Sequence, residues 1–177
     1  MGDIGSPQPV LLIVAVCSRY DQAFDWSLEK LSAEYGKPAL VSERFQFDQT
    51  DYYTASMGTD LRKQFVTFEN LIDPANISQI KIRSNELEDD YRSNFDHPEE
   101  RPLNLDPGYI TESKLILAST KNHAHRIYLK DGIFAEITLF FHKKKWQKHP
   151  WTYPDYQQPE FHAFFSDCRQ FLRSKLS

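Results

Sequence analysis

Apolar residues follow two different periodicities along this chain, and the periodicities predict the order of its elements. Val10–Cys17 is apolar without interruption, which is typical of a central strand covered on both faces. From Asp21, apolar residues recur at helical spacing as far as Gly36, which predicts a helix that ends there. Ala39–Asp48 and Lys63–Glu69 show the alternation of strands. The first part of the chain therefore predicts strand, helix, strand and strand.

The pattern continues with a long helix and a short strand. Asp73 caps the helix, and a proline follows in its first turn. Leu103–Leu105 indicates a short strand, and Asp106-Pro107-Gly108 after it is a turn signal. Thr111 can cap a further short helix.

The first six elements have the order of a ferredoxin-like split βαβ sandwich. A C-terminal β-hairpin and a final helix from about Pro159 would extend the sheet and cover one face. We therefore predict an α+β fold with a disordered N-terminus at residues 1–9 and a single domain at residues 10–177.

The hairpin around Asp131-Gly132 has two possible registers. A two-residue loop would pair Ile127 with Glu136 and mix polar with apolar residues on each face. A three-residue loop, with the glycine left-handed, would pair Arg126 with Glu136 and gather the branched aliphatic residues on one face. Burial favours the second register, because a one-residue slip would turn those residues toward solvent. His125 then points toward the core.

The composition is that of a globular protein. Of 177 residues, 40% are hydrophobic and 14% aromatic, which suffices for a sizeable core. The net charge of -4 argues against a general affinity for nucleic acid. No stretch approaches the roughly twenty apolar residues of a membrane span. Cys17 and Cys168 lie far apart in apolar segments, so we expect a reducing, cytoplasmic location. The sequence indicates neither a cofactor nor an oligomeric state.

Two groups of polar side chains beside predicted strand ends are candidates for an anion site. Asn104, Asp106 and Lys114 surround the turn signal, where the N-terminus of the following helix could receive an anion. Asp48 and Asp51 follow an earlier strand. Their carboxylates could hold Mg²⁺ together with a phosphate, or could cap a turn.

The predicted hairpin and the loop after it supply the remaining candidates. His125 and Glu136 are candidate catalytic residues, since a histidine can transfer protons near neutral pH. Arg126 could orient an anion, or could stabilise the hairpin as the cross-strand partner of Glu136. Trp151 and Tyr153 lie in an aromatic loop that could be a lid, a stacking platform for a base or sugar, or a cover for the core edge.

A metal site is considered at His123 and His125 and is not predicted. The two imidazoles form a His-x-His motif, which could bind a transition metal together with a carboxylate. The favoured register places Glu136 on the opposite face of the hairpin and removes the nearest third ligand.

Several motifs resemble those of a known family. They are Asn104-Leu-Asp-Pro-Gly-Tyr-Ile-Thr, Ser119-Thr-Lys-Asn, His125-Arg-Ile-Tyr-Leu and Trp151-Thr-Tyr-Pro-Asp-Tyr. Over nearly its whole length the chain resembles the prokaryotic domain-of-unknown-function 4416 family, whose members often bear the description GTP-binding protein. The resemblance implies a cytoplasmic protein of bacterial or archaeal type. A P-loop would require the run Gly-x-x-x-x-Gly-Lys-Ser/Thr, and this chain has no such run.

Two functions from different classes remain open. The first is a domain that binds an anionic or phosphorylated small molecule, with or without catalysis. Its site would join Asp48–Gly58, Asn104–Lys114, His125-Arg126 and the Trp151 loop. The alternative is a non-enzymatic domain that docks a protein partner through exposed aromatic residues. A pocket shared by those segments would favour the first function, and an exposed apolar patch the second.

Overall fold

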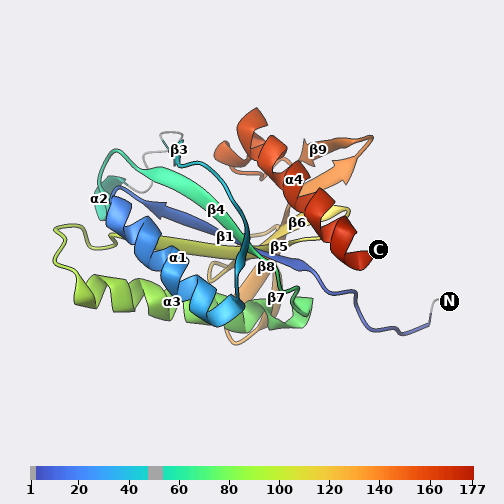
Figure 1. Ribbon diagram of the computed structural model, residues 1–177, viewed down its shortest axis with the longest axis horizontal. Helices are drawn as coiled ribbons and strands as arrows, with labels where there is room; N and C mark the ends of the chain where they lie inside the picture. Colours follow the sequence, from blue (N-terminus) through green and yellow to red (C-terminus); the bar gives the residue numbers. More distant parts are fainter. Residues whose placement is uncertain (1–2, 48–53) are drawn as a thin grey trace.

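The computed structural model describes residues 3–47 and 54–177, and the strands of this part of the chain form one antiparallel sheet (Figure 1). The strands are β1 (Leu11–Ser18), β2 (Pro38–Val41), β3 (Phe45–Gln46), β4 (Arg62–Phe68), β5 (Asn104–Ile110), β6 (Lys114–Ser119), β7 (Ile127–Lys130), β8 (Ile133–His142) and β9 (Lys145–Lys148). The helices are α1 (Asp21–Tyr35), α2 (Thr54–Met57), α3 (Ile77–Asn94) and α4 (Pro159–Leu176), and two short 3-10 helices are η2 (Pro74–Asn76) and η3 (Asp155–Gln157). An α+β fold is therefore confirmed.

Strand β1 lies in the interior of the sheet. The strand order is β2-β4-β1-β5-β6-β8-β7, while β3 also pairs with β4 and β9 with β8. All eight residues of β1 are buried, and the strand pairs with β4 on one side and with β5 on the other. This confirms the prediction of a central strand, which rested on the uninterrupted apolar run.

Helices cover both faces of the sheet. Along β1, Leu12 and Val14 belong to the apolar cluster that α1 and α3 contribute to, while Leu11 and Ile13 belong to the cluster formed with α4. Figure 1 shows the same division, with α1 and α3 on one side of the sheet and α4 on the other. Since successive side chains of a strand point to opposite faces, an uninterrupted apolar run fits this sandwich.

Helix α1 ends at its predicted signal, and α3 and α4 begin at or shortly after theirs. Helix α1 is followed by Gly36, whose φ of 94° is favourable for glycine. Before α3, the side chain of Asp73 accepts a hydrogen bond of 2.8 Å from the N–H of Ala75. Helix α4 begins at Pro159, as predicted. None of the helices in the described residues combines the length and apolar character that crossing a bilayer would need.

The predictions around Pro107 were wrong. The predicted turn at Asp106-Pro107-Gly108 lies within β5, and the helix predicted from Thr111 is replaced by β6. A Cβ atom on Gly108 would lie 2.1 Å from the carbonyl oxygen of Ile116, so this glycine permits a close approach between the two strands. Four successive residues of β6 are buried, and a short apolar run buried on both faces cannot be told from a helix by periodicity.

The hairpin combines features of both registers that the sequence allows. Its turn has two central residues, Asp131 and Gly132, with φ angles of 53° and 77°, so the predicted three-residue loop was wrong. A β-bulge between Tyr128 and Lys130 then shifts the pairing by one residue. Ile127 pairs with Ala135, which is the register predicted for the strands.

The predicted orientation of the hairpin was wrong. Ile127 is 73% exposed, whereas Glu136 and Thr138 are buried. The segment after β9 covers their face, because the Thr152 hydroxyl donates to the carbonyl of Thr138 over 2.6 Å. The polar face of β8 is thus enclosed by other polar groups, and part of its aliphatic face meets solvent.

Candidate functional site

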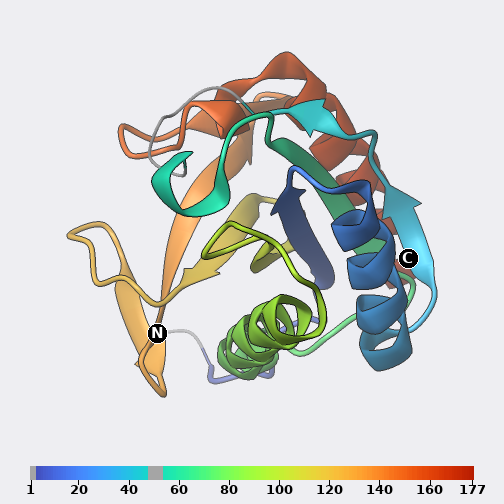
Figure 2. The same ribbon diagram turned by 90° about the vertical axis from the view of Figure 1, so that its left-hand side faces the viewer.

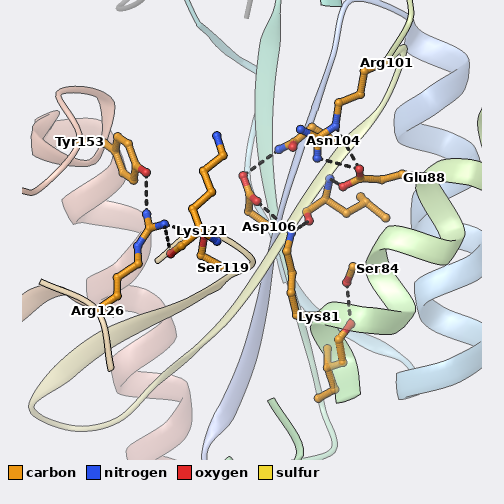
Figure 3. Close-up of polar contacts among 12 residues, drawn as sticks. Lys81, Ser84, Glu88, Arg101, Asn104, Asp106, Ser119, Lys121, Arg126 and Tyr153 are labelled. Carbon is orange, nitrogen blue, oxygen red and sulfur yellow. Dashed lines mark hydrogen bonds and ion pairs between the residues drawn. The ribbon is translucent and has the colours of Figure 1, made fainter. Parts of the chain in front are cut away.

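Two groups of polar residues, most of them at least partly buried, lie on either side of β6: one at β8 and the other between α3 and β5. We call them the Glu136 cluster (His125, Arg126, Glu136, Thr138 and Tyr153) and the Glu88 cluster (Lys81, Glu88, Arg101, Asn104 and Asp106). Figure 3 shows the Glu88 cluster together with Arg126 and Tyr153, and the side chain of Lys121 projects between the two groups.

In the Glu136 cluster, one carboxylate receives three donors. The Nε of Arg126 lies 2.8 Å from Oε2 of Glu136, and the Nε2 of His125 lies 3.0 Å from the same oxygen. The hydroxyl of Thr138 donates to Oε1 over 3.0 Å. The Arg126 and Glu136 side chains are 2% and 0% exposed. This arrangement neutralises a carboxylate that would be costly to bury alone.

Arg126 also joins the cluster to two loops. Its Nη1 donates to the Ser119 hydroxyl over 2.7 Å and to the Lys121 carbonyl over 3.0 Å, and its Nη2 donates to the Tyr153 hydroxyl over 2.8 Å. Burial opposes the charge of Arg126, but the bonds to Glu136 and Tyr153 outweigh it and raise the pKa of the guanidinium. Arg126 therefore stays charged and holds three chain segments together.

The predicted separation of His125 from Glu136 was wrong. His125 lies in a turn that precedes β7, so the strand alternation that placed the two residues on opposite faces does not reach it. In this contact the Nε2 of His125 faces the Glu136 carboxylate, which orients the imidazole ring. Within the described residues, no group of three or more His, Cys, Asp or Glu side chains is arranged to hold a metal ion.

Rings from two segments stack beside this cluster. Trp151 lies parallel to His125, with centroids 5.3 Å apart, and parallel to His149 at 4.6 Å. His125 also stacks on His123 at 5.8 Å. The Nε1 of Trp151 donates to the carbonyl of Ile137 over 3.0 Å, so the aromatic loop is fixed to β8. Trp151 therefore stacks on two histidine rings of the protein itself, His125 and His149.

The Glu88 cluster contains three residues that sequence reasoning missed: Lys81, Glu88 and Arg101. The Nε and Nη2 of Arg101 donate to Oε2 of Glu88 over 3.1 and 2.7 Å. The N–H of Leu105 donates to Oε1 of Glu88 over 2.7 Å. Burial raises the pKa of the Glu88 carboxyl, and the charges of Lys81 and Arg101 oppose that shift.

Asp106, a predicted ligand-binding residue, lies next to this pair. The Nζ of Lys81 donates to its Oδ1 over 3.2 Å and to the Leu105 carbonyl over 2.8 Å, and Asn104 donates to its Oδ2 over 2.7 Å. Burial works to raise the pKa of Asp106, but Lys81 and Lys63 outweigh it and lower the pKa to about 2. The carboxylate is therefore charged at neutral pH.

A third buried pair joins Lys63 of β4 to Asp155 of η3. Burial works to lower the pKa of Lys63, but Asp155 outweighs it and raises that pKa. Cys17 pairs with Lys63 across the strands, and burial raises the pKa of its thiol to about 12. A thiol in this state is a poor nucleophile, so Cys17 offers no covalent chemistry near neutral pH.

A pocket of about 510 Å³ opens beside the Glu88 cluster. Figure 2 shows α2 next to the segment that leads from α3 into β5, and the N–H of Arg101 donates to the Ser56 carbonyl over 2.9 Å. The pocket is lined by Ala55, Ser56, Glu88, Asp89, Arg92, Glu100, Arg101, Pro102, Leu103 and Lys121.

The predicted site residues divide into three sets. His125, Arg126, Glu136, Trp151 and Tyr153 come together around the Glu136 cluster, and Asn104 and Asp106 lie in the Glu88 cluster. Lys114 joins neither, because it begins β6 and lines a separate pocket of about 360 Å³ with Pro7 and Leu176. Asp48 and Asp51 lie outside the described residues.

One signal in the sequence could have identified the missed residues. Lys81, Ser84 and Glu88 stand at helical spacing on the side of α3 that packs against the sheet, among Ile77, Ile80 and Leu87. Polar residues on the apolar side of a helix need partners in the interior. Their presence there predicts a buried polar cluster.

Comparisons with known proteins identify a family and no activity. A family model described as "Domain of unknown function (DUF4416)" matches residues 8–171, nearly the whole chain. No curated protein and no solved structure matches the chain.

Proposed function

Because the chain belongs to the DUF4416 family, a domain of unknown function, we propose its function from geometry: it binds a small anionic molecule in the pocket beside the Glu88 cluster. The observation that carries this proposal is the convergence of three cationic side chains from separate segments. Arg92 comes from α3, Arg101 from the segment before β5, and Lys121 from the segment after β6. Arginine and lysine side chains suit phosphate and carboxylate groups.

The pocket favours a ligand with more than one kind of polar group. Glu88, Asp89 and Glu100 also line it, and their carboxylates accept hydrogen bonds. A phosphorylated or carboxylated metabolite that also carries hydroxyl or amino groups would match both sets. A pocket of about 510 Å³ has the size of sites for small molecules.

The Glu136 cluster is proposed to support this site. Arg126 donates to the carbonyl of Lys121, and Lys121 lines the pocket. The bonds between Arg126 and the protein favour a positioning role for the cluster over direct contact with the ligand. For His125 and Glu136, proton transfer stays a prediction, which His125→Ala can test.

A thermal-shift screen tests the proposed function. Phosphate, pyrophosphate, sugar phosphates, nucleotides and dicarboxylates would be added separately, because a ligand that prefers the folded state raises the melting temperature. We expect a rise with at least one anion, and we expect Arg101→Met or Lys121→Met to abolish it. Arg173→Met is the matched control, since Arg173 of α4 forms an exposed ion pair with Glu112 and lies outside the pocket. No rise with any anion, or an equal rise in all variants, would overturn the proposal.

A protein-interaction domain is the second candidate, and one surface favours it. Ile127 of the terminal strand β7 is exposed, as is Ile137 on β8, and the pairing of Ile127 with Ala135 puts both on one face of the hairpin. Exposed apolar residues that lie together are typical of interfaces. Light scattering after gel filtration would test self-association, and Ile127→Asp should abolish any complex that uses this surface.

We also infer that β1, β2, β4 and β5 with α1 and α3 form a ferredoxin-like split βαβ sandwich. The neighbour order β2-β4-β1-β5 supports this inference, together with the placement of both helices on one face. A cytoplasmic location is a further proposal. The free, buried thiols of Cys17 and Cys168 support it, since such thiols suit a reducing compartment.

A further inference from the structure

We propose that an anionic ligand takes Arg101 away from Glu88, and that Glu88 binds a proton when this happens. The inference rests on the proposed function, since it concerns the same pocket. It makes ligand binding depend on pH through one glutamate.

Arg101 is placed so that it can change partner. Its side chain is 38% exposed and lines the pocket, whereas that of Glu88 is 10% exposed. Its Nε and Nη2 both donate to one oxygen of Glu88, Oε2, so the guanidinium is not matched to both carboxylate oxygens. An anion that enters the pocket meets the guanidinium from the open side.

Glu88 lines the pocket but is bonded to the sheet, so it cannot move with Arg101. Its Oε1 is held by the N–H of Leu105, which belongs to the central strand β5. Lys81, the other cation whose charge acts on Glu88, is bound to Asp106 and to the Leu105 carbonyl. A ligand that takes Arg101 therefore leaves a buried carboxylate with one backbone donor.

The surroundings of Glu88 determine the direction of the proton shift. Burial already raises its pKa, and Lys81 and Arg101 oppose that rise, so a weaker contact with Arg101 raises the pKa further. The charged groups around it are Lys81, Asp89 and Arg92 on α3, Glu100 and Arg101 before β5, Asp106 on β5 and Lys121 after β6. Solvent supplies the proton, and the protonated carboxyl offsets the negative charge that the ligand brings.

Calorimetry with sulfate tests the inference, because sulfate keeps its charge throughout the working range of pH. Titrations in two buffers of different ionisation enthalpy give the number of protons taken up on binding. For the unaltered protein we expect proton uptake at neutral pH, and an affinity that falls up to about tenfold per pH unit above the pKa of Glu88. For Glu88→Gln we expect binding without uptake and with little dependence on pH.

Two controls separate this inference from the proposed function. Asp90→Asn removes an exposed carboxylate of α3 that does not line the pocket, and it should leave proton uptake unchanged. Arg101→Met should raise the pKa of Glu88 even without a ligand, and Arg101→Lys should raise it less. A carbon NMR titration of the Glu88 carboxyl group measures both changes. Sulfate binding without Glu88-dependent uptake would overturn this inference alone. Absence of sulfate binding would overturn this inference, and absence of a thermal shift with every anion of the screen would overturn the proposed anion site as well.

Discussion

The Glu136 and Glu88 clusters contain the same ion pair in two different settings. In each, the guanidinium of an arginine donates to the carboxylate of a glutamate. Arg126 and Glu136 are 2% and 0% exposed, whereas Arg101 and Glu88 are 38% and 10% exposed. The donors of Arg126 are directed to protein groups on three segments, while Arg101 lines a pocket.

The difference shows that exposure, more than residue type, separates a structural pair from a binding pair. A fully enclosed arginine cannot leave its glutamate without stranding two charges in the interior, so the pair holds the fold together. An arginine with one open side can exchange a carboxylate for a ligand, because solvent and the ligand both reach it. Each of the following predictions tests one side of this contrast.

The largest effect is expected for Arg126→Met. The change leaves Glu136 buried without its cation, which should lower the free energy of unfolding by about 3–5 kcal/mol. The matched change Arg101→Met should cost only about 1–2 kcal/mol, since Glu88 keeps the Leu105 N–H and can bind a proton. Urea unfolding of both variants measures the difference.

A double variant controls this prediction. Glu136→Gln added to Arg126→Met removes the stranded charge and should restore part of the lost stability. Equal losses for Arg126→Met and Arg101→Met would contradict the contrast between the two clusters.

The second effect concerns acid unfolding and Asp106. Its pKa in the folded protein, about 2, lies below the ordinary 3.8 of aspartate, so its contribution to stability is present above that value and is lost as pH falls toward 2. The contribution is about 2 kcal/mol, an upper figure because the side chain is 31% exposed. Unfolding measured from pH 5 to pH 2 should show a steeper loss in the unaltered protein than in Asp106→Asn. Parallel curves would contradict the proposed charge on Asp106.

Much of the fold could be predicted from the sequence because apolar burial determines it. The run at Leu12 and Val14 has the pattern of a strand between two layers, and Gly36 ends the first helix by its backbone conformation. The error at β6 has the same origin. Its apolar run is buried on both faces, so its periodicity does not separate strand from helix, and the preceding threonine bonds a turn instead of capping a helix.

The candidate site could be predicted only in part, because partners distant in sequence decide the state of each polar group. The hairpin motif brought Arg126 and Glu136 together through local pairing. Glu88 and Arg101 are joined by the path of the chain from α3 into β5, and no short motif records that path. The buried polar face of β8 depends on Thr152, which arrives from a later loop.

A smaller effect is expected for His125→Ala. The change removes one of three donors to Glu136 and should lower stability by about 1 kcal/mol. If the anion binds at the Glu88 cluster and the Glu136 cluster only supports the fold, sulfate binding should not change. His123→Ala is the control, since His123 stacks on His125 and should cost less. A large loss of binding with an unchanged melting temperature would instead place His125 at the ligand.

An effect as small as that of His125→Ala is expected for Gly132→Ala, in the turn that connects Arg126 and Glu136 along the chain. Gly132 has a φ of 77°, which disfavours other residues, although nothing lies within 4 Å of an added Cβ. The cost should therefore come from the backbone alone and amount to about 1 kcal/mol. Gly5→Ala is the control, because Gly5 also has open space around it but is not left-handed. Hydrogen exchange should show faster opening of β7 and β8 in Gly132→Ala, with no change at Glu88 and Leu105. Faster exchange at both clusters would mean that the Arg126–Glu136 pair also stabilises the pocket. The Glu136 and Glu88 clusters would then be coupled.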